Sequence, residues 1–336
     1  MKTTAILSDD TSLLGKIIER GGVVVFPTET VYGIGASSLD FEACRRIYKI
    51  KNRPSDNPLI AHFANIEQIL EFCIVSDESL LLFKTFSPGP LTLVLEKKSD
   101  SIFPPDRKTI AVRIPSHNLA RELIRASGVP ISAPSANLSG KPSFTRRKDV
   151  IECFQNLVDG ILLAEDPEIG IESTVVDMTK DVPVLLRPGK ISQEDLLKVL
   201  PHLVLPEAGL QGSENKIRSE ESIPESPGMK YRHYSPEAEV VLLEKKMFGE
   251  SLSHYRKKDF GKSALSDKKA GFIGFGFLPV HSWDRVLSSN EDYMKELYSF
   301  FVDADHLGLD ICYCEIPKDD PAKQALINRL EKAKNK

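Results

Sequence analysis

The stretch "VVVFPTETVYGIGA", residues 23–36, decides the fold prediction because its character changes in the middle. The first half is a run of β-branched and aromatic residues, which is typical of a buried strand. Pro27 then interrupts the run and begins a polar loop that contains glycine. A buried strand that ends in a polar loop is how an α/β protein commonly builds a binding site at one edge of its sheet.

On both sides of this stretch, apolar strands and amphipathic helices intermix over the first 200 residues. Strands are predicted at 58–63, 91–96, 109–115, the start of 129–140, 160–166 and 173–178. Helices are predicted at 13–22, 41–51, 119–128 and 191–200, with Gly22 and Gly128 as stop signals. Because the elements follow no strict strand–helix–strand rhythm, we predict an open α/β layer fold with a mixed sheet.

The composition changes after about residue 203. Residues 206–239 are rich in Pro, Gly, Ser and Glu, and this run is longer than an ordinary connection between elements. Beyond it, strands and helices resume at 240–244, 270–276, 291–305, 310–316 and 322–334. We therefore predict a first domain at 1–203, a linker at 204–237 and a smaller α/β domain at 238–336, as the length of 336 residues also suggests.

The bulk composition excludes several classes of protein. With 41% hydrophobic and 27% charged residues and a net charge of -4, the chain does not have the strongly basic balance of a general nucleic-acid binder. Asp9 and Asp10 stand where a signal peptide needs its apolar core, and no apolar run approaches the roughly 20 residues that span a bilayer. The odd number of cysteines, five, fits a reducing compartment, so we expect a cytoplasmic protein without membrane contact.

A second informative stretch is "KIKNRPSDNPLI", residues 49–60, in which Lys49, Lys51 and Arg53 alternate before Pro54. In an extended chain these three cations would share one face and could line the edge of an anion-binding groove. A charged, solvated surface is the alternative interpretation.

Several common motifs are absent. The glycines of 271–276 lack the G-x-G-x-x-G order and indicate a glycine-bearing strand end, and no P-loop occurs. "SANLSG" at 135–140 is not a serine-hydrolase elbow, and the seven histidines show no zinc-binding spacing. What remains is a set of polar loops that follow apolar strands, at 27–33, 51–58, 133–145, 170–177 and 185–189. Each alone reads as a plain turn, but together their hydroxyls, amides and cations favour an anionic small-molecule site.

These loops, taken in order, resemble the threonylcarbamoyl-AMP synthase family, which has the YrdC-like fold. The motifs are "FPTETVYGIGA", "KNRPSDNPL", "PGPLTLVL", "AVRIP", "APSANLSGKPS", "GIESTVVD" and "LLRPG". "SPGMKYRHYSP" (226–236) and "ALINRLEKA" (325–333) are similar to the linker and the C-terminal end of the long, two-domain form of the family. The resemblance covers the whole chain, densely to residue 190 and thinly between about 240 and 310.

The resemblance implies an open twisted sheet with a positively charged concave face, a smaller Rossmann-like C-terminal domain, and a specific reaction. L-threonine, bicarbonate and ATP, with Mg²⁺ carried by the nucleotide, would give L-threonylcarbamoyl-AMP and pyrophosphate. A downstream threonylcarbamoyl transferase complex would then place the group on adenosine 37 of tRNAs that read codons starting with A. Weak RNA binding would be possible, and no metal site built by the protein is implied.

The resemblance also implies roles for individual residues. L-threonine would contact Thr30, His62, Arg113, Ala133 and Ser173. ATP would contact Lys51, Arg53, Asn57, Thr109, Ser135, Ser143, Arg187 and Tyr234, with Lys51 and Arg53 as the catalytic residues near the triphosphate. The linker that carries Tyr234 would act as a lid.

Plainer roles stay open for some of these positions: His62 as a core histidine, Thr109 and Arg113 as surface strand residues, and Arg187 in a loop salt bridge. Tyr32 is interpreted as a packing residue and left out of the site. The chain departs from the family pattern at Phe144, where proline is usual, and at Glu165 and Asp166, where a glycine pair is usual. These two carboxylates would either bind magnesium or face solvent.

Two other functions compete with this one. The nearest enzyme is the carbamoyl-adenylate enzyme embedded in hydrogenase maturation proteins, which shares the YrdC-like module and uses carbamoyl phosphate. A different class is an RNA-binding module whose basic face grips RNA without catalysis. The sequence leaves open the oligomeric state, the downstream partner and the role of the C-terminal domain.

Overall fold

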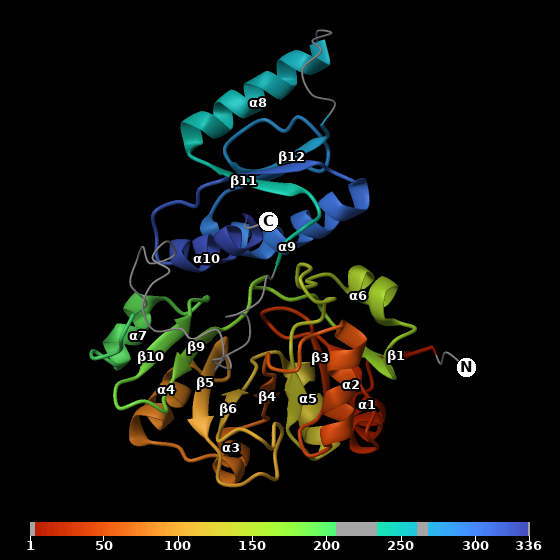
Figure 1. Ribbon diagram of the computed structural model, residues 1–336, viewed down its shortest axis with the longest axis vertical. Helices are drawn as coiled ribbons and strands as arrows, with labels where there is room; N and C mark the ends of the chain where they lie inside the picture. Colours follow the sequence, from red (N-terminus) through yellow and green to blue (C-terminus); the bar gives the residue numbers. More distant parts are fainter. Residues whose placement is uncertain (1–3, 206–233, 261–267, 335–336) are drawn as a thin grey trace.

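The structure, a computed structural model, describes residues 4–205, 234–260 and 268–334. Within these ranges the chain forms two units, each built on its own sheet (Figure 1). Most of the predicted linker, residues 206–233, lies outside the described residues. Among the helices that the structure does describe, none combines the length and the apolar character needed to cross a bilayer.

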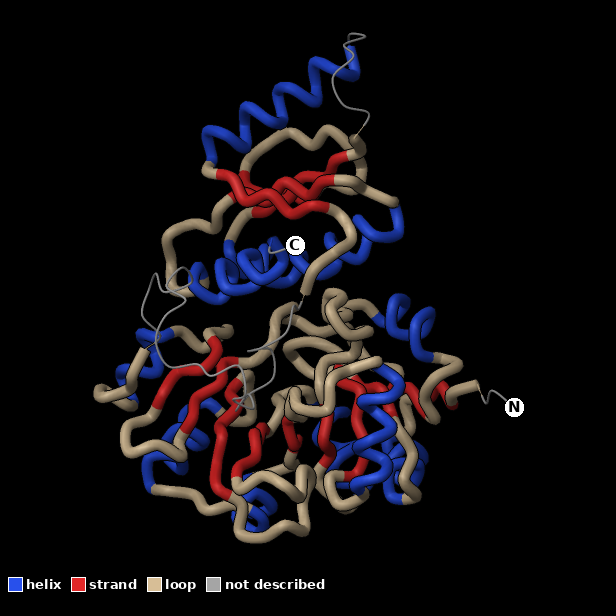
Figure 2. Tube along the Cα trace, in the orientation of Figure 1, coloured by secondary structure: helices blue, strands red, loops and turns tan. Residues whose placement is uncertain are grey.

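The first unit contains a sheet in the order β1-β8-β2-β3-β7-β4-β6-β5-β9-β10. Parallel and antiparallel neighbours both occur, for example β4 with β6 and β4 with β7, so the prediction of a mixed α/β sheet is confirmed. Figure 2 shows the strands in red with helices in blue around them. The strands are β1 (Ile6–Ser8), β2 (Val24–Phe26), β3 (Gly33–Ser37), β4 (Ile60–His62), β5 (Leu91–Glu96), β6 (Thr109–Arg113), β7 (Ile131–Ala133), β8 (Gly160–Leu162), β9 (Thr174–Asp177) and β10 (Val184–Arg187).

Strand β2 shows why the run at residues 23–26 is apolar without alternation. Val24 and Phe26 join one buried cluster, which contains residues of α1 and α5, whereas Val25 joins another, which contains residues of α2 and α6. A strand covered on both faces needs apolar residues at every position. The helices of this unit are α1 (Thr11–Glu19), α2 (Phe41–Lys51), α3 (Ile66–Phe72), α4 (Asp77–Phe86), α5 (Asn118–Ser127), α6 (Arg147–Phe154) and α7 (Gln193–Val199).

The second unit is a parallel sheet in the order β11-β14-β12-β13. Helix α8 lies on one side of this sheet, and α9 and α10 lie on the side that faces the first unit (Figure 1). This arrangement agrees with the predicted smaller α/β unit. Its elements are β11 (Glu239–Leu243), α8 (Lys245–Phe260), β12 (Ala270–Phe275), β13 (Arg285–Leu287), α9 (Asn290–Leu307), β14 (Ile311–Glu315) and α10 (Lys323–Lys334).

The two units share a buried apolar cluster. Val31 and Ile171 of the first unit pack into the cluster formed mainly by α9, α10 and the strands of the second unit. Gly170 shows how close the contact is: a Cβ atom there would lie 2.3 Å from the carbonyl oxygen of Met294, and its φ of 86° also favours glycine. An ion pair between Arg146 and Asp303, at 2.6 Å, crosses the same interface.

Several elements escaped the sequence prediction. Helices α3, α4, α6 and α8 and strands β1, β3 and β13 were not predicted, and β10 falls within a segment that was interpreted as a loop. Strand β3 is rich in glycine because neighbouring side chains leave no room for larger residues. A Cβ atom on Gly35 would lie 2.5 Å from the Ile131 side chain. Small residues weaken the strand signal, so a requirement for close packing hid this element.

Candidate active site

The polar loops of the first unit converge on one pocket. It contains much of the predicted site and several residues that were not predicted. The lining residues are Thr28, Thr30, Val31, Tyr32, Gly33, Arg53, Ile60, His62, Arg113, Ala133, Pro134, Ser135, Glu172, Ser173, Arg187 and Tyr234.

Arg113, the last residue of β6, anchors one side of the pocket. Its Nη1 donates to Thr30 Oγ1 at 2.9 Å, and its Nη2 lies 2.7 Å from Glu29 Oε1. Burial alone would raise the pKa of Glu29, but the Arg113 guanidinium holds it below its ordinary value. This side of the pocket therefore presents hydroxyls and a guanidinium whose charge is balanced by a carboxylate.

His62 lies beside this pair because β4 and β6 are parallel and His62 pairs with Arg113 in their register. Its Nδ1 is 3.0 Å from the carbonyl oxygen of Ile60, and its ring meets Phe26 edge-on with 5.9 Å between centroids. Burial and the nearby Arg113 lower the pKa of His62 to about 3. The imidazole is therefore neutral at physiological pH, and Nδ1 carries the proton because a carbonyl oxygen only accepts.

Arg187 and Arg53 are the other two arginines that line the pocket, and we refer to them as its second side. Arg187 Nε donates to the carbonyl oxygen of Ser173 at 3.0 Å, and its Nη2 donates to Ser173 Oγ at 3.1 Å. Arg53 donates through Nε to the carbonyl oxygen of Asn57 and through Nη2 to that of Pro58, both at 3.1 Å. Burial lowers the pKa of Arg53 to about 10, which still leaves it charged at neutral pH.

Glu172 joins this side to the second unit. Ser143 Oγ donates to Glu172 Oε1 at 2.7 Å, while the hydroxyl of Tyr298 and Nε of Arg329 approach Oε2 at 2.9 and 3.1 Å. Burial would raise the pKa of Glu172, but Arg329 and then Arg187 hold it below its ordinary value. Glu172 is thus an ionised carboxylate shared between the two units.

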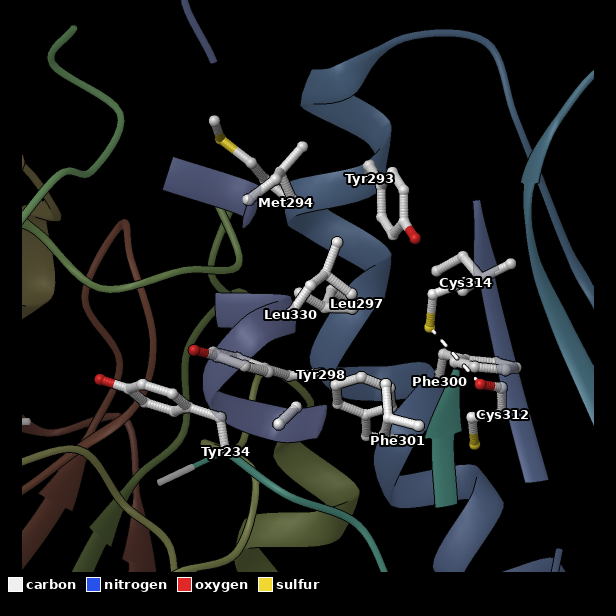
Figure 3. Packing of buried hydrophobic residues seen from close by; sticks show 14 of the residues in the cluster. Tyr234, Tyr293, Met294, Leu297, Tyr298, Phe300, Phe301, Cys312, Cys314 and Leu330 are labelled. Atoms are coloured by element: carbon white, nitrogen blue, oxygen red, sulfur yellow. Dashed lines mark hydrogen bonds between the residues drawn. The ribbon is translucent and has the colours of Figure 1, made fainter. Parts of the chain in front are cut away.

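Tyr234, at the described end of the linker, lines the pocket. Its ring stacks on Tyr298 with 5.4 Å between centroids and 22° between planes. Figure 3 shows the two side chains next to each other. Only 5% of the residue is exposed, and its φ of 72° lies in the left-handed region, which an aromatic residue rarely adopts. Packing against the second unit holds this strained backbone in place.

Lys51 does not line the pocket. Its Nζ, buried under the loop at 135–140, donates to the carbonyl oxygen of Ser135 at 2.6 Å, and also to the backbone and side-chain oxygens of Asn137. Burial and then Arg53 lower its pKa well below the ordinary value. In this arrangement Lys51 holds the loop that carries Ser135.

The prediction that Lys49, Lys51 and Arg53 share one face of an extended chain is wrong. Helix α2 continues to Lys51 and ends at Asn52, whose φ is 51°. Lys49 is exposed, Lys51 is 1% exposed, and Arg53 lines the pocket. The alternating cations therefore point in different directions, because the helix predicted at 41–51 forms over its full length and includes Lys49 and Lys51.

Three other predicted ATP contacts also lie outside the pocket lining. Asn57 is buried behind Arg53, Thr109 begins β6 opposite Glu96, and Ser143 bonds to Glu172. The remaining predicted contacts are brought together in the pocket: Thr30, Arg53, His62, Arg113, Ala133, Ser135, Ser173, Arg187 and Tyr234.

The structure accounts for the departures from the family pattern. Phe144 packs edge-on against Phe154, with 6.1 Å between centroids, so the bulky residue fills the core beneath the loop. Asp166 accepts hydrogen bonds from the hydroxyl of Tyr32 and the backbone N–H of Arg147, at 2.8 and 2.7 Å. Glu165 is exposed. In the part of the chain that the structure describes, no three His, Cys, Asp or Glu side chains are grouped to hold a metal ion.

Sequence reasoning missed Thr28, Glu29, Tyr32 and Glu172, although all four belong to loops that it singled out. It noted residues 325–333 only as similar to the C-terminal end of the family and gave no role to Arg329, a cation on the last helix that is completely buried against the first unit. Spacing along a helix does not reveal that a charge will meet a carboxylate from another domain.

Comparison with known proteins matches both units of the chain. Residues 16–189 match the Sua5_yciO_yrdC family, described as telomere recombination, and residues 191–334 match the threonylcarbamoyl-AMP synthase C-terminal domain. The threonylcarbamoyl-AMP synthase of Pyrococcus abyssi is 39% identical over 321 residues, covering 94% of this chain and 91% of that protein. The enzyme of the same name from Bacillus subtilis is 38% identical over 329 residues, with 94% and 90% coverage.

Solved structures of Sua5 proteins are similar to this chain over nearly its whole length. A double alanine variant of P. abyssi Sua5 superposes with a TM-score of 0.86 and 36% identity, covering 99% of this chain and 96% of that one. P. abyssi Sua5 complexed with L-threonine gives a TM-score of 0.85 and 35% identity, with 99% and 98% coverage.

Proposed function

Because the chain belongs to the threonylcarbamoyl-AMP synthase family, we propose that it joins L-threonine, bicarbonate and ATP into L-threonylcarbamoyl-AMP and releases pyrophosphate. It is an enzyme of the nucleotidyltransferase type. We further propose that the product serves the threonylcarbamoylation of adenosine 37 in tRNAs that read codons starting with A, in the cytoplasm, through a downstream transferase complex.

The observation that carries the proposal is the division of the pocket into two sides of different charge. On one side the Arg113 guanidinium is balanced by Glu29 and bonded to Thr30. On the other, Arg53 and Arg187 donate to backbone carbonyls and to Ser173. A zwitterionic amino acid suits the balanced side, and a polyphosphate suits the side with excess positive charge.

We assign L-threonine to Thr30, His62, Arg113, Ala133 and Ser173. The neutral His62 supports this assignment, since a second cation beside Arg113 would repel the ammonium group of the substrate. Arg113 binds a carboxylate well because its planar group presents several N–H donors. The complex of P. abyssi Sua5 with L-threonine supports the substrate class.

We assign the nucleotide to Arg53, Ser135, Arg187 and Tyr234, with Mg²⁺ brought by the phosphates. Adenylation requires mainly positioning and neutralisation of the charge at the α-phosphate, which arginine side chains and the metal ion provide. In this scheme Lys51, Asn57 and Ser143 do not touch the nucleotide. They hold the loops of three pocket residues, which are Ser135, Arg53 and Glu172 respectively. Thr109 keeps its proposed contact with ATP only if the nucleotide extends along β6.

The chemistry follows from a protected pocket. The amine of threonine combines with bicarbonate, releasing water, or with carbon dioxide, releasing a proton, to give a carbamate. A carbamate oxygen then attacks the α-phosphate as pyrophosphate leaves. Carbamates decompose readily in water, so the pocket has to exclude solvent between the two steps. Tyr234, which is 5% exposed at the wall of the pocket, supports such a role.

The decisive experiment measures pyrophosphate release from Mg-ATP with L-threonine and bicarbonate, and with each one omitted. We expect release only when both co-substrates are present, together with a threonylcarbamoyl-AMP mass in the product. Release with carbamoyl phosphate in their place would instead indicate a maturation-type carbamoyl-adenylate enzyme. No release, combined with RNA affinity that falls steeply with salt, would indicate a binding module.

A further inference from the structure

Arg329, on α10 of the second unit, reaches the loops that form the pocket of the first unit. The residue is 0% exposed. Its Nε donates to Glu172 Oε2 at 3.1 Å, its Nη2 to the Glu172 carbonyl oxygen at 3.2 Å, and its Nη1 to the Pro188 carbonyl oxygen at 2.6 Å. Glu172 precedes Ser173, and Pro188 follows Arg187, so one guanidinium ties together the two loops that carry these pocket residues.

The same region fixes Tyr234. The guanidinium carbon of Arg329 lies 5.8 Å from the centroid of the Tyr234 ring, whose stacking partner Tyr298 also donates to Glu172. Ser235 then donates to the carbonyl oxygen of Ala333 near the end of α10, at 3.1 Å. The described end of the linker is therefore held by the same two helices that hold Glu172.

We propose that Arg329 is a positioning residue of the nucleotide side, through which the second unit completes the ATP site. It acts on Arg187 through Glu172 and Pro188, and on Tyr234 through its ring. The proposal rests on the proposed function for the identity of the ligand, and it gives the second unit a defined role. Without Arg329 the nucleotide side loses its geometry, whereas the contacts among Arg113, Thr30 and Glu29 on the threonine side keep theirs.

The charges around Glu172 support this role. Arg187, Arg329 and Lys332 all interact electrostatically with this one carboxylate. Burial, with Arg329 and Arg187, lowers the pKa of Lys332 to about 7, as expected where cations are in excess. A polyanion such as the triphosphate of ATP relieves that excess, and Arg329 and Lys332 show that part of it comes from the second unit.

The test compares Arg329→Met and Arg329→Lys with the wild-type enzyme by measuring kcat and the KM values for ATP and L-threonine. For Arg329→Met we expect kcat/KM for ATP to fall about 10- to 100-fold, with the KM for L-threonine changed less than about threefold. Arg329→Lys should recover only part of the loss, because an ammonium group cannot reproduce the planar fork that spans Glu172 and Pro188.

Arg146→Met is the matched control. Arg146 also crosses between the units, donating to both carboxylate oxygens of Asp303 at 2.8 and 2.6 Å, but it lines no part of the pocket. We expect its kinetic constants to stay within about twofold of wild type. An equal loss in both variants would overturn the proposal, because general contact between the units would then explain the effect.

A buried glutamate without its partner could unfold Arg329→Met, so the double variant Glu172→Gln/Arg329→Met, which leaves no buried unpaired charge at this pair, is measured as well. If Glu172 and Arg329 act as one positioning unit, kcat/KM for ATP in the double variant should be no lower than in either single variant. If they act independently, the two fold-losses in kcat/KM should multiply.

Calorimetry with a non-hydrolysable Mg-ATP analogue separates this proposal from the proposed function. Failure of the wild-type enzyme to release pyrophosphate would refute the synthase activity alone. The positioning role would still be supported by weaker nucleotide binding in Arg329→Met than in Arg146→Met, and unchanged binding in Arg329→Met would overturn it.

Discussion

The two sides of the pocket differ in how their charges are held. On the side proposed to bind L-threonine, Arg113 and Glu29 neutralise each other within one unit, and strand register fixes the cation beside His62. On the side proposed to bind the nucleotide, Glu172 faces Arg187 from its own unit and Arg329 from the other. The charges of the first side come from the first unit alone, whereas those of the second side come from both units. We therefore expect substitutions on the first side to affect stability most, and those on the second to affect catalysis.

Arg113→Met should give the largest effect on stability. It leaves the buried Glu29 carboxylate without its partner, which typically costs about 3–5 kcal/mol in the free energy of unfolding. Urea denaturation measures this loss. Adding Glu29→Gln should restore much of the stability but none of the affinity for L-threonine. A single variant as stable as the wild-type protein would show that the pair is not the structural anchor of this side.

Arg53→Ala should leave stability less affected than Arg113→Met, because the described hydrogen bonds of Arg53 go to carbonyl oxygens of its own loop. The loss of charged hydrogen bonds to a phosphate, about 1.5–3 kcal/mol, should lower kcat/KM for ATP about 10- to 100-fold. Lys49→Ala is the control from the same basic stretch: Lys49 is exposed on α2, so its kinetic constants should not change. Comparable losses of kcat/KM in both variants would support the initial prediction that Lys49 and Arg53 line one edge of an anion-binding groove.

The free energy of unfolding of the protein should depend on pH through His62, which lies on the threonine side of the pocket. Its pKa is about 3 in the folded protein and about 6.5 when unfolded, so between these values only the unfolded chain binds the proton. Stability should then fall by about 1.4 kcal/mol for each pH unit below 6.5. Unfolding measured between pH 7 and 5, above the range in which Glu29 and Glu172 titrate, should show a shallower slope for His62→Asn. Parallel slopes would contradict the assignment.

Tyr234→Leu should have the smallest effect. Loss of the stacking contact with Tyr298, about 0.5–1.5 kcal/mol, should raise the KM for ATP about 2- to 10-fold. The melting temperature should hardly change, because most of the apolar cluster shared by the two units remains. A change in the KM for L-threonine alone would mean that Tyr234 belongs to the other side.

An element of the fold could be predicted where its local sequence carries a clear helix or strand signal. Strands β5 and β6 and helices α5 and α9 coincide closely with their predicted ranges, because apolar periodicity and a glycine stop signal are local properties. Strand β3 was missed because its glycines serve close packing against Ile131. Helix α2 was recognised, but extending it through Lys51 conflicted with the interpretation of 49–53 as extended chain.

For the site, the sequence identified the loops that converge but not how charges pair within them. Thr30, His62 and Arg113 were singled out, whereas Glu29 and Glu172, each adjacent to a predicted contact, were not. Lys51 was predicted to reach the triphosphate, yet its ammonium is committed to the loop at 135–140. Pairing between distant segments depends on tertiary structure, and for Arg329 it also depends on the docking of a second unit.

The left-handed backbone of Tyr234 has an energetic consequence. A non-glycine residue held at a φ of 72° stores of order 1–3 kcal/mol, which is released when the residue leaves this position. Contacts with the second unit, including the stacking on Tyr298, outweigh that energy in the structure. If Tyr234 belongs to a lid as proposed, the stored energy would be recovered each time the lid opens, and it would favour departure of the product to its acceptor.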